Sequence, residues 1–410
     1  MGNRPAVEVS GIYQTVSRGI GRCYNYVTLS KPDNIKSGSR WLFIWPAAAI
    51  LITVLAAANP FYRPEISLGG GTTAWLVAMT VAFMGWLHPL AARAAVLLTG
   101  LFLAVPCFLN APPLFRGWLM VCMLLPLAIV SVPILVPSVT GFRARLALLC
   151  SWDETRPLQR RPASFQTGSL LQLILSAAIF AAAIAAVIVV PASGFWLLAR
   201  WLAGGIIMMA AAEMITAFHN FLTALLGITT PSLMQSPCLA TSVGEFWTRR
   251  WNPGTSMFLR RCCFEPLAGC SPTLGLWAAF AVSGVGHALL FYMAGGRWGI
   301  ALANGAFFVV QPLFILAERQ MNIRRWPMAA LRAWTLTILA ITSPLFIEPG
   351  LQLAQASFVQ GSILPPALFA VSLVVIIQGF FLLAALFACP RGEDVKAPLR
   401  NPPANPQEAK

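Results

Sequence analysis

The sequence predicts an all-α polytopic membrane protein, a helical bundle of about 9–10 transmembrane helices. Of its 410 residues, 58% are hydrophobic and only 10% are charged, with a mean hydropathy of +0.74. That composition leaves far more apolar surface than a soluble fold of this length would bury. The apolar residues also come in runs of about 20, which is the length of a membrane-spanning helix. Because the runs are continuously apolar rather than alternating, they favour helices over a β-barrel.

The apolar runs set the expected order of spans. They fall at 41–58, 73–91, 94–111, 117–137, 169–191, 195–226, 274–294, 299–317, 333–348 and 366–388. The loops between them are alternately rich and poor in arginine, so the positive-inside rule places both termini in the cytoplasm. We therefore expect an integral multi-pass protein of a bacterial cytoplasmic membrane or the endoplasmic reticulum. The membrane domain would cover 41–390, between a cytoplasmic N-terminal segment, 1–40, and a proline-rich, disordered cytoplasmic tail, 391–410.

The formal charge of +15 does not indicate a nucleic-acid partner. The arginines stand between apolar runs, whereas a nucleic-acid site needs a dense basic patch on a soluble surface. They are better explained as topology signals and contacts to lipid head groups of the bilayer. The nine cysteines are scattered without a CxxC pair, so no metal site or disulfide framework is expected.

One polar stretch, 242–287, interrupts the membrane pattern. Ser242 with Glu245 three residues later forms a capping box, which predicts the start of a short helix. A Pro-Gly pair should stop this helix just after Asn252, and a second short helix should begin at about Ser256. The part 242–272 is too polar to span lipid and too aromatic for an ordinary loop. We expect a re-entrant or interfacial element, whose backbone must be covered by protein or line a cavity.

Ionisable and strongly polar side chains inside spans are costly and are candidates for function. Glu213 and Asn220 are seven residues apart and share nearly the same helical face, while His219 points about a third of a turn away. They either line the substrate cavity or pack against the polar element that follows.

His287 lies in the middle of an apolar run that contains no charge to pair with it. Ser283 and Gly284, four and three residues earlier, put a hydroxyl and a gap on the same face. Another backbone or a ligand can therefore approach closely there.

The residues of this region resemble a known family. The run SPCLATSVGEFWTRRWN, then a basic amphipathic stretch and SGVGH, resembles the wax-synthase-like branch of the membrane-bound O-acyltransferases. The stretches FFVVQPLFILAE, RRWPMAALRAWT and TSPLFIEP are also similar to that branch, so the resemblance covers about residues 200–350. Thr248 departs from the glycine that the family usually has. The resemblance implies a bundle around a substrate tunnel, with acyl-CoA as co-substrate, no other cofactor, and a hydrophobic alcohol as acceptor.

The resemblance also assigns roles to residues. The family's histidine matches His287, and its second polar residue matches Asn252. Acyl transfer needs a base for the alcohol proton and stabilisation of the developing oxyanion. An imidazole, with a pKa of about 6.5, makes His287 the expected base. Asn252 either holds the thioester carbonyl or orients the histidine.

Two pairs of side chains near Asn252 are candidates for binding acyl-CoA. Arg249 and Arg250 pair with CoA phosphates, for which guanidinium geometry is suited, or they bind lipid head groups. Trp247 and Trp251 are four residues apart and should share a helix face. They flank the pantetheine or anchor the element at the membrane interface.

The main alternative is a multi-pass transporter in which Glu213, His219 and His287 form a polar relay. Such a transporter should show inverted repeats with a broken helix in each half. The sequence shows one such break, at 242–272, without a partner. Acyl transfer is therefore the preferred interpretation.

Overall fold

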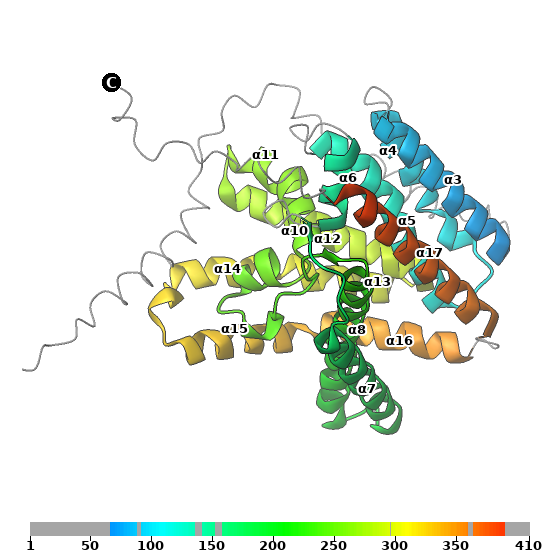
Figure 1. The fold of residues 1–410 in the computed structure, drawn as a ribbon. Helices are drawn as coiled ribbons and strands as arrows, with labels where there is room; N and C mark the ends of the chain where they lie inside the picture. Colours follow the sequence, from blue (N-terminus) through cyan, green and yellow to red (C-terminus); the bar gives the residue numbers. More distant parts are fainter. Residues whose placement is uncertain are drawn as a thin grey trace, which may run out of the picture. The chain divides into compact units, whose positions relative to one another are not determined.

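The computed structural model describes residues 66–87, 92–135, 142–151, 158–295, 297–359 and 364–389. Within them the chain is almost entirely helical, with one pair of two-residue strands (Figure 1). The predicted helical membrane bundle is therefore confirmed. The segments 1–40, 41–58 and 391–410, for which we made predictions, lie outside the described residues.

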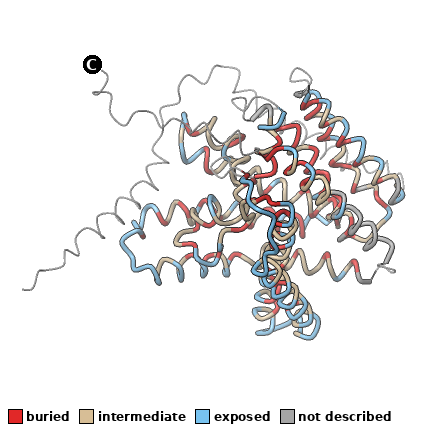
Figure 2. The backbone as a smooth tube through the Cα atoms, viewed as in Figure 1, coloured by how far each residue is buried: buried red, intermediate tan, exposed pale blue. Residues whose placement is uncertain are grey.

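The first helices form an extensive apolar core. This group consists of α3 (Leu68–Leu87), α4 (Ala92–Phe102), the 3-10 turn η2 (Val105–Phe108), α5 (Pro113–Leu135), α6 (Phe142–Ser151) and α17 (Leu364–Ala388). Figure 2 shows buried positions along α3 and α5, which pack against each other. Trp75 is buried there, and its indole Nε1 donates to the carbonyl of Cys122 at 3.0 Å. The polar edge of this ring is thus satisfied inside the apolar core.

One predicted span of this group is too short to cross a bilayer. The run at 94–111 forms α4, which has 11 residues and rises only about 16 Å at 1.5 Å per residue. The chain then turns through η2, where Pro106 lies in the first turn and has no N–H to continue a helix. Hydropathy alone did not reveal this break.

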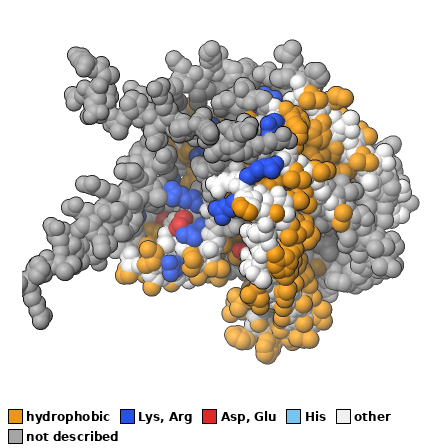
Figure 3. All heavy atoms as spheres, in the orientation of Figure 1, with side chains coloured by type: hydrophobic (Ala, Val, Ile, Leu, Met, Phe, Trp, Pro, Cys, Tyr) orange, Lys and Arg blue, Asp and Glu red, His pale blue; other side chains and the backbone are white. Residues whose placement is uncertain are grey.

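The helices α7 (Thr167–Val189) and α8 (Trp196–Leu225) lie side by side as a hairpin. Their surface is covered by apolar side chains (Figure 3). Only 11% of α7 and 28% of α8 is buried by protein, so their exposed apolar faces are suited to lipid. After α8, the strand β2 (Ile228–Thr229) pairs antiparallel with β1 (Gln159–Arg160). Gly227 has a φ of +68°, and a Cβ there would lie 2.6 Å from the Arg161 carbonyl, so this turn requires glycine.

The later helices carry two breaks that were not predicted. They are α12 (Pro272–Gly295), α13 (Trp298–Val309), α14 (Gln311–Gln320), η6 (Ile323–Arg325), α15 (Met328–Thr342) and α16 (Pro344–Val359). The run expected at 299–317 divides at Val310, and the run at 333–348 bends by 45° between α15 and α16. Pro312 and Pro344 follow these breaks, and neither can donate a backbone hydrogen bond to the preceding turn. α13 packs against both α12 and α16.

Six helical stretches of the described residues are long and apolar enough to cross a membrane, with α13 and α14 counted together as Trp298–Gln320; the bent pair α15–α16 would make a seventh if it is one span. Of the other expected spans, the run at 94–111 forms the short helix α4, and the run at 366–388 forms the 25-residue helix α17. The run at 41–58 lies outside the described residues. The multi-pass character is confirmed. The orientation of the termini and the identity of the membrane stay predictions.

Candidate functional site

The polar segment after Ser242 is a series of short helices. They are α9 (Val243–Glu245), the π-helical turn η4 (Phe246–Arg250), α10 (Pro253–Leu259), the π-helical turn η5 (Arg260–Phe264) and α11 (Glu265–Ala268). The predicted helix start is confirmed, because the Ser242 Oγ accepts from the backbone N–H of Glu245 at 2.9 Å. The second half of the predicted capping box differs. The Glu245 carboxylate accepts from the N–H and the Oγ of Thr241, at 2.8 and 2.6 Å.

Arg250 fastens this segment to the chain that precedes it. Its Nε donates to the Glu245 carboxylate at 2.7 Å, and its Nη1 donates to the carbonyls of Gln235 and Ser236, both at 3.1 Å. Burial raises the pKa of the Glu245 carboxyl, but the hydrogen bonds from Thr241 and the hydrogen bond and charge of Arg250 outweigh burial. The pKa is therefore held below its ordinary value.

The two arginines of the predicted CoA site differ in their surroundings. The guanidinium of Arg250 makes three bonds within the protein, which is a structural role that the sequence did not indicate. Arg249 is exposed. Of the two, Arg249 is therefore the better placed to reach a soluble phosphate group.

The prediction that Trp247 and Trp251 share a helix face is wrong. The helix widens into the π-helical turn η4, and Trp251 lies beyond its end with an extended backbone (φ −95°, ψ 111°). The Trp251 ring stacks on Phe246 with centroids 5.7 Å apart. The Trp247 ring instead lies 5.5 Å from Phe308, and its Nε1 donates to the Gln311 Oε1 at 3.2 Å. Trp247 thus anchors the segment to α13 and α14.

Asn252 is the cap of the following helix and not the last residue of the preceding one. The first helix ends at Arg250, and α10 begins at Pro253, earlier than the expected start at Ser256. Asn252 has a positive φ of 44°, and its side-chain oxygen Oδ1 accepts from the backbone N–H of Thr255 at 3.1 Å. Asparagine tolerates this left-handed conformation better than most residues and is a preferred helix cap. The proline at the first helical position is also typical of a helix start.

Glu318 holds the start of the segment from a helix 75 residues away, and the sequence did not single it out. Its carboxylate accepts from the backbone N–H of Val243 at 2.7 Å, from that of Gly244 at 3.4 Å and from the Trp334 Nε1 at 3.1 Å. Glu318 is only 6% exposed. A carboxylate at a helix N-terminus is stabilised by the helix dipole and by the N–H groups that have no intrahelical partner.

His287 lies in α12 beneath two aromatic rings. Its ring stacks on Phe308 at a centroid distance of 3.9 Å, and the Phe346 ring lies 6.0 Å away. The ring nitrogen Nδ1 is 2.9 Å from the carbonyl oxygen of Ser283 in the preceding turn. Because Phe308 also contacts Trp247, that one ring joins the histidine to the 242–272 segment.

The gap beside His287 is filled by another helix. A Cβ on Gly284 would lie 2.8 Å from the carbonyl oxygen of Gly305 in α13, and a Cβ on Gly305 would lie 2.8 Å from that of Gly284. The sequence left open whether a backbone or a ligand approaches Gly284, and the structure shows a backbone. Gly284 therefore serves the close packing of α12 on α13, and Ser283 supplies the carbonyl that holds His287.

The three polar residues of α8 form no common site. Glu213 accepts from Gln172 of α7 at 2.6 Å, and the Nδ1 of His219 lies 3.0 Å from the side-chain oxygen of Gln378 in α17. The Oδ1 of Asn220 accepts from the Thr230 hydroxyl at 3.0 Å. Of the two alternatives left open, packing against the segment after α8 thus holds for Asn220. Because Glu213, His219 and His287 bond to three different partners, the described contacts do not join them into a relay.

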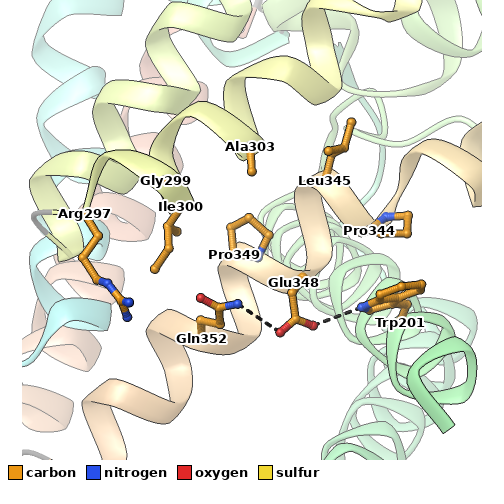
Figure 4. A pocket seen from close by; sticks show the side chains of 10 residues that line it. All are labelled: Trp201, Arg297, Gly299, Ile300, Ala303, Pro344, Leu345, Glu348, Pro349 and Gln352. Carbon is orange, nitrogen blue, oxygen red and sulfur yellow. Dashed lines mark hydrogen bonds between the residues drawn. The ribbon is translucent and has the colours of Figure 1, made fainter. Parts of the chain in front are cut away.

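The predicted tunnel residues do not line the cavity that lies between α13 and α16 (Figure 4). The five residues proposed from sequence are Ser283, Gly284, Glu213, His219 and Asn220. Their hydrogen bonds and packing are those described above. A continuous tunnel from the cytoplasm stays a prediction.

The region around the segment matches known proteins. Residues 230–310 match the family model "Membrane bound O-acyl transferase family". A "Probable long-chain-alcohol O-fatty-acyltransferase 2" of Arabidopsis thaliana is 33% identical over 152 residues, which are 34% of this chain and 43% of that protein. A "Probable long-chain-alcohol O-fatty-acyltransferase 7" is 29% identical over 140 residues, 30% of this chain and 40% of that protein. An "Acyl-CoA--sterol O-acyltransferase 1" is 33% identical over 122 residues, which are 26% of this chain and 34% of that protein. These last two proteins are also from Arabidopsis thaliana.

The described part of the chain is a multi-pass helical bundle with His287 in one membrane-length helix and a polar segment of short helices beside it. The matches agree with this architecture and confirm the resemblance seen in the sequence. Residues 230–310 are thus similar to the membrane-bound O-acyltransferase family, and the relatives that they match are named as O-acyltransferases. The matched part spans less than half the length of these relatives.

Proposed function

We propose that the chain transfers an acyl group from acyl-CoA to the hydroxyl of a lipophilic alcohol, with His287 as the general base. The observation that carries this proposal is the contact between the His287 Nδ1 and the Ser283 carbonyl at 2.9 Å. A carbonyl oxygen only accepts hydrogen bonds, so Nδ1 must carry the ring proton. Nε2 then keeps the lone pair that a general base needs. The position of His287 inside the family segment 230–310 supports the same assignment.

The proposed reaction is a direct transfer. Nε2 of His287 takes the proton of the alcohol hydroxyl as the alcohol oxygen attacks the thioester carbonyl carbon. The C–S bond then breaks, the carbonyl re-forms as an ester, and the departing CoA thiolate takes the proton from the imidazolium. A positioned general base typically contributes about two to four orders of magnitude in rate.

Asn252 is proposed to stabilise the oxyanion rather than to orient the histidine. Its Oδ1 is used by the Thr255 N–H, so Nδ2 remains as a two-proton donor directed away from that cap. His287 already has an orienting partner in Ser283. An amide donor for a developing oxyanion is typically worth about two to three orders of magnitude in rate.

The substrates follow from the same reasoning. The relatives' names refer to long-chain alcohols and to a sterol as acceptors, and both are lipophilic alcohols. The exposed Arg249 is proposed to contact the phosphates of acyl-CoA. The proposed chemistry needs no further cofactor, because the thioester itself activates the acyl group.

The test compares purified wild type with His287→Ala and with His219→Ala in lipid nanodiscs. Each protein is incubated with acyl-CoA of several chain lengths and with hexadecanol or a sterol, and both free CoA and ester are quantified. The His219 variant is a matched control, because it removes an imidazole that contacts Gln378 and not Ser283. We expect ester formation to fall at least about a hundredfold in His287→Ala and to persist in His219→Ala.

Two outcomes contradict the proposal. A folded His287→Ala that forms ester at the wild-type rate removes the histidine from the reaction. Absence of ester with every alcohol, combined with substrate flux across proteoliposomes that both histidine variants abolish, would instead support the polar relay of a transporter.

A further inference from the structure

A cavity of about 460 Å³ lies between α13, α16 and α8, outside the segment 242–287 (Figure 4). Its volume lies in the range of roughly 300–1,000 Å³ that is common for small-molecule sites. The walls are mainly apolar, with Ile300 and Ala303 on α13 facing Leu345 and Pro349 on α16. Such a cavity in a membrane protein fits a lipophilic ligand.

One end of the cavity is polar. The Glu348 carboxylate lies there and accepts from the Trp201 Nε1 at 3.0 Å and from the Gln352 Nε2 at 3.2 Å (Figure 4). A carboxylate offers about four acceptor positions, so positions remain for a ligand. Glu348 makes no ion pair within the described part of the chain. An acidic side chain on an apolar membrane helix is costly and usually serves a function.

The chemistry of this end selects the ligand. A carboxylate can only accept, so the ligand must present a hydrogen-bond donor. Arg297 lines the same cavity and is exposed at the start of α13, and its charge opposes a cationic donor such as an amine. A neutral hydroxyl satisfies both conditions. The apolar walls then require that the rest of the ligand be hydrophobic.

The cavity lies close to His287 but does not contain it. Leu345 lines the cavity, and its neighbour Phe346 packs on the histidine ring at 6.0 Å. Asn304 of α13 fixes this part of α16 by donating to the Phe346 carbonyl at 3.3 Å. Phe346 and Glu348 are two residues apart and therefore point to nearly opposite sides of α16. A ligand bound to Glu348 is thus separated from His287 by the wall that contains Phe346.

We infer that this cavity is a docking site for the alcohol acceptor, which waits there with its hydroxyl on Glu348 and its apolar body against Ile300, Ala303 and Leu345. The inference rests on the proposed acyl transfer for the identity of the ligand. Transfer itself takes place at His287. The docking site therefore sets the alcohol concentration that gives the half-maximal rate. It takes no part in the chemistry of the thioester.

A direct binding experiment uses a long-chain alcohol with a photoreactive diazirine next to the hydroxyl. The full chain in nanodiscs is irradiated with this probe, and the labelled peptides are identified by mass spectrometry. We expect labels on α13 and α16 that excess hexadecanol removes and excess hexadecane does not. Ala303→Phe, which fills the cavity, should reduce the labelling at least about fivefold. Leu302→Phe is the matched control, because Leu302 is 62% exposed and does not line the cavity.

A kinetic experiment tests the role of the carboxylate. Glu348→Gln keeps the side-chain shape but replaces a charge-assisted hydrogen bond by a neutral one. The alcohol concentration for half-maximal rate should rise about tenfold, and the acyl-CoA concentration for half-maximal rate should stay the same. The same substitution at Glu265, which pairs with Arg260 and Arg261 outside the cavity, is the control and should change neither value.

The two proposals can fail separately. If ester is formed but the label lies elsewhere, or if Ala303→Phe and Glu348→Gln leave the alcohol dependence unchanged, the docking site is refuted and acyl transfer stands. If no ester is formed, acyl transfer fails, and the labelling still decides whether the cavity binds a hydroxyl. Labelling that His287→Ala retains would support a docking position distinct from the transfer position.

Discussion

Replacing Glu318 with leucine should detach the start of the polar segment that begins after Ser242. In the wild type, this carboxylate accepts short hydrogen bonds from the Val243 N–H at 2.7 Å and from the Trp334 Nε1 at 3.1 Å. Val243 is fully buried, so water cannot replace the lost acceptor. The helix that begins at Val243 continues directly into the turn before Asn252.

The magnitude follows from the two donors. The buried Val243 N–H without an acceptor costs about 1–3 kcal/mol, and losing the bond to the half-buried Trp334 costs about 1 kcal/mol more, so Glu318→Leu should cost roughly 2–4 kcal/mol in the free energy of unfolding. Glu318→Gln keeps an oxygen for both donors but loses the charge. Since hydrogen bonds to charged groups are stronger by about 1 kcal/mol each, the glutamine variant should cost roughly 2 kcal/mol.

Thermal unfolding of the purified variants in one detergent measures this order. The apparent midpoint should fall from wild type to Glu318→Gln and further to Glu318→Leu, with ester formation falling in the same order. Glu265→Leu is the control, because its partly exposed ion pairs with Arg260 and Arg261 contribute at most about 1 kcal/mol. Wild-type midpoints and rates in Glu318→Leu would refute the view that this carboxylate holds the segment.

Three further predictions concern single positions. In Gly284→Ala the new Cβ would meet the Gly305 carbonyl at 2.8 Å, and overpacking of about 1–3 kcal/mol should lower the unfolding midpoint; Gly286→Ala, which faces open space, should not lower it. Because the pKa of Glu245 is depressed, its contribution to stability is present above about pH 4.5 and lost as the pH falls further. The acid-induced fall of the midpoint should therefore be smaller in Glu245→Gln. Asn252→Gly keeps the positive φ and costs only a few tenths of a kcal/mol as a cap, yet it should slow ester formation about 10²–10³-fold; an unchanged rate would remove the amide from the reaction.

Local features of the fold could be predicted from the sequence. The cap at Ser242 depends on residues three apart, and the apolar runs of α3, α5, α7, α8 and α12 predict membrane-length helices whether protein or lipid covers their faces. The helix starting at Pro253 could also have been predicted, since proline favours the first helical position. Pro312 and Pro344 likewise mark helix starts. Because each lies inside a continuous apolar run, hydropathy predicted one unbroken span in both places.

Long-range partners could not be predicted. The bond between Glu318 and Val243 joins residues 75 apart, and nothing in the local pattern connects them. The roles of Arg250 and Trp247 likewise depend on the π-helical turn η4, which changes the spacing that a regular helix would give. His287 stood out as a histidine inside an apolar run, but its role and that of Asn252 were assigned only because their neighbours resemble a family. The cavity at Glu348 was missed because its walls come from three separate helices.

The length of α8 couples the site to the thickness of the bilayer. Its 30 residues rise about 45 Å, roughly 15 Å more than the hydrocarbon core. The helix must therefore tilt or emerge from the membrane. Near its end, the Asn220 side chain accepts a hydrogen bond from Thr230, just after strand β2, and the chain leads from there to Asn252. A thinner or thicker membrane thus changes the height of the segment 242–272 relative to the membrane surface.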